Sequence, residues 1–142
     1  MEQEKKTIEN RLISFFIEMN KWEKNCNQIE NDASLTFQEK EQNEKKIVSE
    51  IFEKFCTKKD RLQGLPNIIS FGNEGSYIYD PIEEKITEIT FEDKSKAIAT
   101  TRRNKPIEQL HKFSLKKIKE IWLIDSKKRY SDWQKKWLDI AI

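Results

Sequence analysis

The spacing of apolar residues predicts a long helix over residues 2–30. Seven apolar residues recur there at alternating intervals of four and three, which places them in one stripe along a helix. The stripe consists of Ile8, Leu12, Phe15, Met19, Trp22, Cys26 and Ile29, and Ile13 and Phe16 widen it. The polar run 31–34 ends the pattern. The same spacing fits a coiled coil, but only about three heptads are present and no later segment continues them.

A second helix is predicted to begin near Thr36. Thr36 and Glu39 have the spacing of a capping box, in which each side chain satisfies the other residue's backbone N–H. A polar stretch follows, and residues 47–56 then supply a dense apolar face. The helix is expected to end around Lys58–Lys59, because cations suit the carboxyl end of a helix dipole.

Beyond residue 60 the pattern changes from helical to strand-like. All three glycines and Pro66 lie within residues 60–76, which predicts a loop with a short strand at 67–71. Alternation in 86–91 and 96–102 around a polar turn then predicts a β-hairpin. Two more strands are predicted at 107–116 and 118–125, with Lys116–Lys117 as their turn. A short terminal helix is predicted from Ser131, with Trp133, Trp137, Leu138 and Ala141 on one side.

This order of elements predicts an α+β fold with segregated helices and strands. Two long N-terminal helices come first, a curved antiparallel sheet of about four strands follows, and a short helix closes the chain. We expect the sheet to fold over the N-terminal helix and bury the stripe around Trp22. Residues 1–142 are predicted to form a single domain.

The composition is compatible with a folded protein although 37% of the residues are charged. Leu, Ile, Val and Phe make up about a quarter of the chain, above the roughly 20% typical of disordered sequences. No apolar run approaches the ~20 residues needed to span a bilayer, and the charged start has no leader pattern. Cys26 and Cys56 lie in helical patterns, and we interpret them as reduced thiols facing the core of a cytoplasmic protein.

The chain offers few candidates for catalytic chemistry. His111, the one histidine, shares the parity of Phe113 and Leu115 in a predicted strand, which favours a structural imidazole over a catalytic one. Asp80 and Asp125 flank apolar strand segments, where burial would raise a carboxyl pKa, but both are explained more simply as turn or capping residues. No metal-ligand spacing and no phosphate-binding glycine loop is present, so we expect no metal and no cofactor.

The charges are unevenly distributed along the chain. Residues 102–136 hold twelve cations and four anions, a net charge of +8, whereas residues 1–60 hold eleven cations and thirteen anions. A basic surface of this kind attracts an acidic partner, although a merely solvated lysine-rich surface gives the same count. Nucleic-acid binding is disfavoured, because the cations are mostly Lys and no aromatic RNA-binding motif accompanies them.

Several short motifs in roughly residues 45–138 follow one another in a familiar order. They are Ile51-Phe52-Glu53-Lys54-Phe55-Cys56-Thr57 with Arg61, Ser70-Phe71-Gly72, Tyr79-Asp80-Pro81, the alternating Ala97, Ala99 and Thr101, Phe113-x-Leu115-x-Lys117, and Trp122-x-Ile124-Asp125. In their order and spacing these segments resemble the nuclear-transport-factor-2-fold (NTF2-fold) immunity proteins, of the kind paired with Rhs-type polymorphic toxins in bacteria.

The resemblance implies a cone-shaped fold and a non-enzymatic role. The protein would bind a cognate toxin domain, encoded nearby, in the cytoplasm of the producing bacterium. Neither a nucleic acid nor a membrane is expected as a partner, and the sequence leaves open whether the protein forms a homodimer. The basic rim contacts with the toxin are predicted to be Arg102, Arg103, Lys127, Lys128 and Arg129.

The alternative is a small-molecule enzyme or ligand-binding protein, because related cone folds hold enzymes that use an Asp or His inside the cone. Its cavity would be lined by His111, Asp80, Asp125 and Trp122. An apolar pocket into which these side chains converge would support this alternative.

Overall fold

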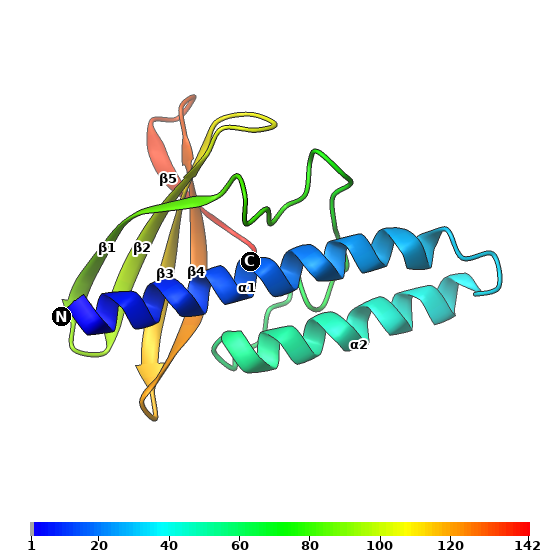
Figure 1. Ribbon diagram of the computed structural model, residues 1–142, viewed down its shortest axis with the longest axis horizontal. Helices are drawn as coiled ribbons and strands as arrows, with labels where there is room; N and C mark the ends of the chain where they lie inside the picture. Colours follow the sequence, from blue (N-terminus) through cyan, green and yellow to red (C-terminus); the bar gives the residue numbers. More distant parts are fainter. Residues whose placement is uncertain (1) are drawn as a thin grey trace.

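The computed structural model describes residues 2–142 and contains two helices and five strands (Figure 1). The helices are α1 (Glu2–Glu30) and α2 (Phe37–Phe55). The strands are β1 (Lys85–Asp93), β2 (Lys96–Arg103), β3 (Gln109–Ile118), β4 (Ile121–Ser131) and β5 (Lys136–Ile140). Each strand pairs antiparallel with the next, in the order β1-β2-β3-β4-β5. The predicted α+β class is confirmed, with five strands in place of about four.

Helix α1 crosses the sheet with its first half and extends past it with its second half, where α2 runs alongside (Figure 1). The predicted stripe is buried from Ile8 to Cys26, whereas Ile29 is half-buried and Ile13 is exposed. Trp22 packs against Phe71 and donates its indole N–H to the Glu44 carbonyl at 2.9 Å. Around Trp22 the stripe is therefore buried by α2 and the following loop, whereas in its first half Phe16 packs against Phe113 of β3. The expectation that the sheet buries the stripe holds for its first half and is wrong for the part around Trp22.

Helix α2 begins as predicted and ends earlier. The Thr36 side chain accepts from the Glu39 amide at 3.2 Å, and the Glu39 carboxylate accepts from the Thr36 amide at 2.9 Å, which completes the capping box. The helix stops at Phe55 because Cys56 forms a bridge with Ile124 of β4 and the Thr57 amide donates to the Ile124 carbonyl at 2.9 Å.

The segment between α2 and β1 contains no strand at 67–71, contrary to the prediction. Glu23 of α1 instead holds the later part of this loop. Its carboxylate accepts backbone N–H groups from Gly72, Ile78 and Tyr79 at 2.8–2.9 Å. A carboxylate thus satisfies amides that would otherwise be buried without partners.

The chain ends in a β-hairpin and not in the predicted helix. Residues 136–140 form β5, which pairs with the second half of β4. Ser131, the expected helix cap, accepts the Gln134 amide at 3.1 Å and closes a turn. Trp133 lies in this turn and is 93% exposed, whereas the prediction placed it in a helix, on one side with Trp137, Leu138 and Ala141. A capping signal marks a local backbone turn, and the pairing partner decides which element follows it.

The turn between β3 and β4 is also displaced from its predicted position. It lies at Lys119–Glu120, where φ is 50° and 66°, and not at Lys116–Lys117. Left-handed turns of this kind are usually marked by Asn or Gly, and neither residue is present here. No helix in residues 2–142 is long and apolar enough to cross a membrane. Both cysteines are buried and free.

Candidate functional site

The helix-facing side of the sheet holds a buried cluster of charged side chains around Glu84. The Glu84 carboxylate contacts Nδ1 of His111 at 2.8 Å, accepts the Thr101 hydroxyl, and lies 3.8 Å from the Arg103 guanidinium. All four residues are buried. His111 is buried, as expected of a structural imidazole, and it meets a carboxylate there. Among residues 2–142, it does not line any of the hollows described below.

The protonation states in this cluster follow from its contacts. Burial lowers the pKa of His111, and the nearby Lys127 charge adds to this, so the imidazole is neutral and its Nδ1–H donates to Glu84. Burial works to raise the pKa of Glu84, but the hydrogen bonds from His111 and Thr101 outweigh it and the pKa is lowered. Glu84 is therefore ionised, and the neighbouring His111 and Thr101 donate hydrogen bonds to its carboxylate. These contacts indicate a structural role for the cluster.

Two of the five predicted rim cations lie inside the protein. Lys127 is 4% exposed, and its ammonium lies 4.5 Å from the Tyr79 ring centre; burial lowers its pKa to about 8. Arg103 donates to the carbonyls of Tyr77 and Ile78 at 2.9–3.0 Å. The prediction of rim contacts is therefore wrong for Arg103 and Lys127, because their charged groups are enclosed.

The other predicted cavity residues do not converge on His111. Asp80 accepts the amides of Ile82 and Glu83 and closes a turn before β1. Trp122 donates its indole N–H to Glu4, at the start of α1, at 3.0 Å. Asp125 accepts the Thr57 hydroxyl at 2.7 Å on the opposite side of β4 from the buried Ile124. The structure divides these residues among separate environments.

The end of the sheet formed by loop 104–108 and turn 132–135 exposes apolar side chains, in contrast to the buried Glu84 cluster. The two segments lie side by side in Figure 1. Trp133 and Ile107 expose their side chains here beside a hollow of about 240 Å³. Arg129 and Tyr130 line the same hollow. We call this region, defined by Ile107, Leu110, Arg129, Tyr130 and Trp133, the sheet tip.

Of the predicted cations that stay exposed, Arg129 belongs to the sheet tip, and Arg102 and Lys128 lie near it. Arg102 pairs with Glu108 at its edge, and Lys128 lies 3.9 Å from Asp139 on the outer face of the sheet. Next to them, Tyr130 packs against Trp137 with 5.4 Å between ring centres. Trp133 was not predicted to lie on the surface; the available signal was that it is the one apolar residue among the six residues between Tyr130 and Trp137.

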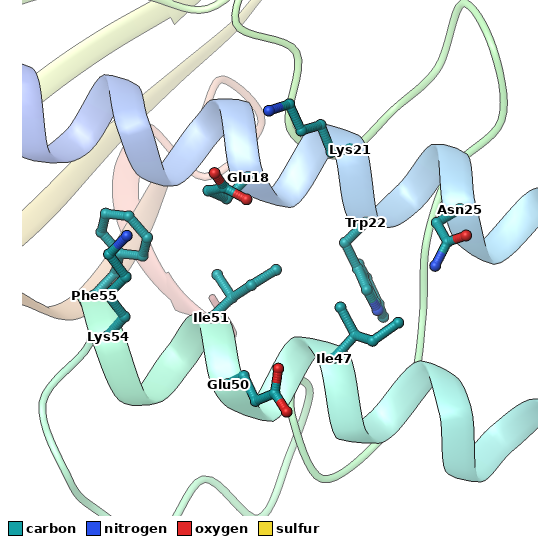
Figure 2. Close-up of a pocket in the computed structure, with 9 residues that line it drawn as sticks. All are labelled: Glu18, Lys21, Trp22, Asn25, Ile47, Glu50, Ile51, Lys54 and Phe55. Atoms are coloured by element: carbon teal, nitrogen blue, oxygen red, sulfur yellow. The ribbon is translucent and has the colours of Figure 1, made fainter.

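A second hollow, of about 380 Å³, lies between the two helices (Figure 2). Trp22, Ile47 and Ile51 form its apolar floor. Its charged lining is balanced, since it contains two glutamates, Glu18 and Glu50, and two lysines, Lys21 and Lys54. This groove therefore has no charge preference that would select a partner.

Comparisons with known proteins agree with the architecture. The family described as NTF2 fold immunity protein matches residues 7–141. The chain is also 30% identical over 131 residues to the immunity protein RhsIA of Dickeya dadantii (strain 3937). The aligned region covers 92% of each of the two chains. No solved structure matches it. Since the family match spans almost the entire chain and the helix-backed antiparallel sheet is the fold that the resemblance implies, the chain belongs to the NTF2-fold immunity proteins.

Proposed function

We propose that this protein neutralises a cognate bacterial toxin domain by binding it stoichiometrically, and that the sheet tip carries the central contact. An exposed Trp beside Ile107 and Tyr130 is the observation that carries the proposal. Trp, Tyr and Arg dominate binding energy at protein interfaces, because large rigid side chains bury much area at low entropic cost. Because the Trp133 side chain is 93% exposed, it contributes almost no buried area to the fold of the free protein.

The charges around the sheet tip favour an acidic partner. Arg102, Lys128 and Arg129 lie near the aromatic residues, and Arg129 forms no ion pair within residues 2–142. Cations at the rim of an interface accelerate association with an acidic surface and contribute less to the final affinity. The aromatic centre then supplies the affinity and the basic rim supplies orientation.

The test uses the toxin domain encoded beside the gene. Co-expression of this protein is expected to rescue growth, and calorimetry is expected to give one molecule of each chain per complex. Trp133→Ala should weaken binding by roughly 30-fold or more, since a central Trp contributes about 2 kcal/mol or more.

Phe37→Ala is the matched control, because Phe37 is a similarly large aromatic side chain, 76% exposed, at the start of α2. It should leave the affinity unchanged. An unaltered affinity of the Trp133→Ala protein would place the toxin elsewhere on the surface. A toxin that stays lethal and forms no complex with the unsubstituted protein would refute the function itself.

A further inference from the structure

A third hollow lies at the opposite end of the β3–β4 hairpin from the sheet tip. It is formed by the hairpin turn, the start of β4 and the residues that follow α2, and its volume is about 550 Å³. This is larger than the other hollows described above and falls within the range of ligand-sized pockets. We call it the hairpin hollow.

The floor of the hairpin hollow is apolar and exposed. Ile118 and Ile121 pair across the hairpin, and they are 44% and 51% exposed. Leu123 continues the floor along β4. These side chains lie on the face of the sheet opposite Trp122 and Ile124, which are buried, so the fold itself does not use them. Apolar side chains grouped in a hollow on a charged surface are typical of a contact site.

The rim of the hairpin hollow is strongly basic. Five lysines line it together with two carboxylates, Glu53 and Asp125. Asp125 is already neutralised, because Lys59 and Lys116 lie 3.3 Å and 3.5 Å from its oxygens. The remaining lysines are Lys54, Lys58 and Lys119, and none of these three forms an ion pair within residues 2–142.

The wall between the floor and the rim is held in place before any partner binds. The Thr57 hydroxyl donates to Asp125 at 2.7 Å, and the Arg61 guanidinium donates to the Thr57 carbonyl at 3.2 Å. Burial works to raise the pKa of Asp125, but the Thr57 hydrogen bond and the charges of Lys59 and Lys116 lower it, so Asp125 is ionised at neutral pH. A rigid site loses less entropy when it binds.

We propose that the hairpin hollow is a docking site for an acidic polypeptide segment that carries a large apolar side chain. The apolar side chain covers Ile118, Ile121 and Leu123, and the carboxylates of the segment pair with the three lysines. These lysines come from the end of α2, from the segment after it and from the hairpin turn, so their charges are spread along the rim. A segment with several carboxylates matches such a rim better than a small anion with one. The inference does not depend on toxin binding at the sheet tip.

The test measures binding of fluorescein-labelled peptides by anisotropy. The probe peptides are short, rich in Asp and Glu, and carry two adjacent Leu or Phe residues at varied positions. One matched set replaces the apolar pair by Ser, and a second replaces the acids by Lys. We expect the acidic apolar peptides to bind, and we expect the peptides of either matched set to bind roughly tenfold or more weakly. Added salt should weaken the binding of the acidic apolar peptides.

Substitutions in the hollow locate the site. Ile121→Thr keeps a strand-forming residue and removes part of the floor, so it should weaken peptide binding, whereas Ile82→Thr, at a more exposed site away from the hollow, should not. The pair Lys58→Glu with Lys119→Glu should transfer the preference from the acidic to the lysine peptides. Trp133→Ala should leave peptide binding unchanged, which separates this site from the sheet tip.

Three results would overturn the proposal. The first is an absence of binding tighter than about 1 mM by every acidic peptide. The second is binding that is insensitive to Ile121→Thr and to the charge reversal. The third is displacement of the peptides by dodecanoate at comparable concentration, because this would show a site for small anionic amphiphiles.

Discussion

Lys127 and Lys128 are neighbours on β4, and the structure gives them opposite surroundings. Lys127 faces the helices, is 4% exposed, and lies over the Tyr79 ring within the Glu84 cluster. Lys128 faces solvent on the outer side of the sheet, near the sheet tip. Because successive side chains of a strand point to opposite faces, two adjacent lysines serve two different purposes. The basic count of a segment therefore overstates the charge that its surface can offer a partner.

The same contrast separates the two faces of the whole sheet. Between the inner face and α1, the carboxylates of Glu23 on α1 and of Glu84 before β1 accept hydrogen bonds from the protein, so their charges hold the loop and the strands together. On the outer face and at its ends, the aromatic and basic side chains of the sheet tip and the lysines of the hairpin hollow stay partly or fully exposed. Substitutions on the inner face should change stability, and substitutions on the outer face should change binding.

The largest effect is expected from reversing the charge of the two neighbouring lysines. Lys127→Glu would bury a second carboxylate beside Glu84, and an uncompensated buried charge costs about 3–5 kcal/mol. Lys128→Glu removes one long, exposed ion pair with Asp139 and should change the free energy of unfolding by less than about 0.5 kcal/mol. Urea denaturation of both variants measures the difference. Similar free energies of unfolding for the two variants would contradict the different surroundings of Lys127 and Lys128.

A medium effect is expected at Glu44, a buried carboxylate without the donors that Glu84 has. Its Oε2 atom has no hydrogen-bond partner, and burial together with the Glu30 charge raises its pKa from 4.5 to about 7. The folded protein therefore binds a proton that the unfolded chain releases between these values. The stability that this group contributes is complete below pH 4.5 and is lost as the pH rises through about 7.

Glu44→Gln should remove this dependence. We expect the variant to be about 1–3 kcal/mol more stable than the unsubstituted protein at pH 8, and to differ little from it at pH 4.5. Urea denaturation at both pH values measures this difference. Glu50→Gln, at an exposed position of α2, is the control and should show no such pH-dependent gain. An equal effect of Glu44→Gln at both pH values would mean that the carboxyl is not protonated by the fold.

The smallest effect is expected at the β3–β4 turn on the outer face. Glu120 has a φ of 66°, where a side chain costs about 1 kcal/mol and glycine costs little. Glu120→Gly should therefore be more stable than Glu120→Ala by about 1 kcal/mol in thermal or urea unfolding. Both variants lose the exposed ion pair between Glu120 and Lys117, so the comparison isolates the backbone. A more stable alanine variant would contradict the left-handed turn.

Local rules in the sequence determined much of the fold. The four–three stripe predicted α1, the Thr36–Glu39 capping box predicted the start of α2, and strand alternation predicted that His111, Phe113 and Leu115 face inward. Each of these signals acts between residues that are near one another in the chain, so it can be read without the tertiary structure. The succession of motifs also indicated the family, which the comparisons confirm.

Pairing between distant residues decided the rest. Ser131 reads as a helix cap, but residues 136–140 find hydrogen-bond partners on β4, and this pairing makes a hairpin and exposes Trp133. A β-bulge between Ser114 and Leu115 shifts the pairing of β3 with β4 and helps to place Lys127 inside. Parity along one strand cannot reveal such a shift, because the burial of a side chain depends on register with the neighbouring strand and on the helices that cover it. The sequence therefore determined both helices, most of the strands and the family, and the tertiary structure decided how the chain ends and which charged residues are available to a partner.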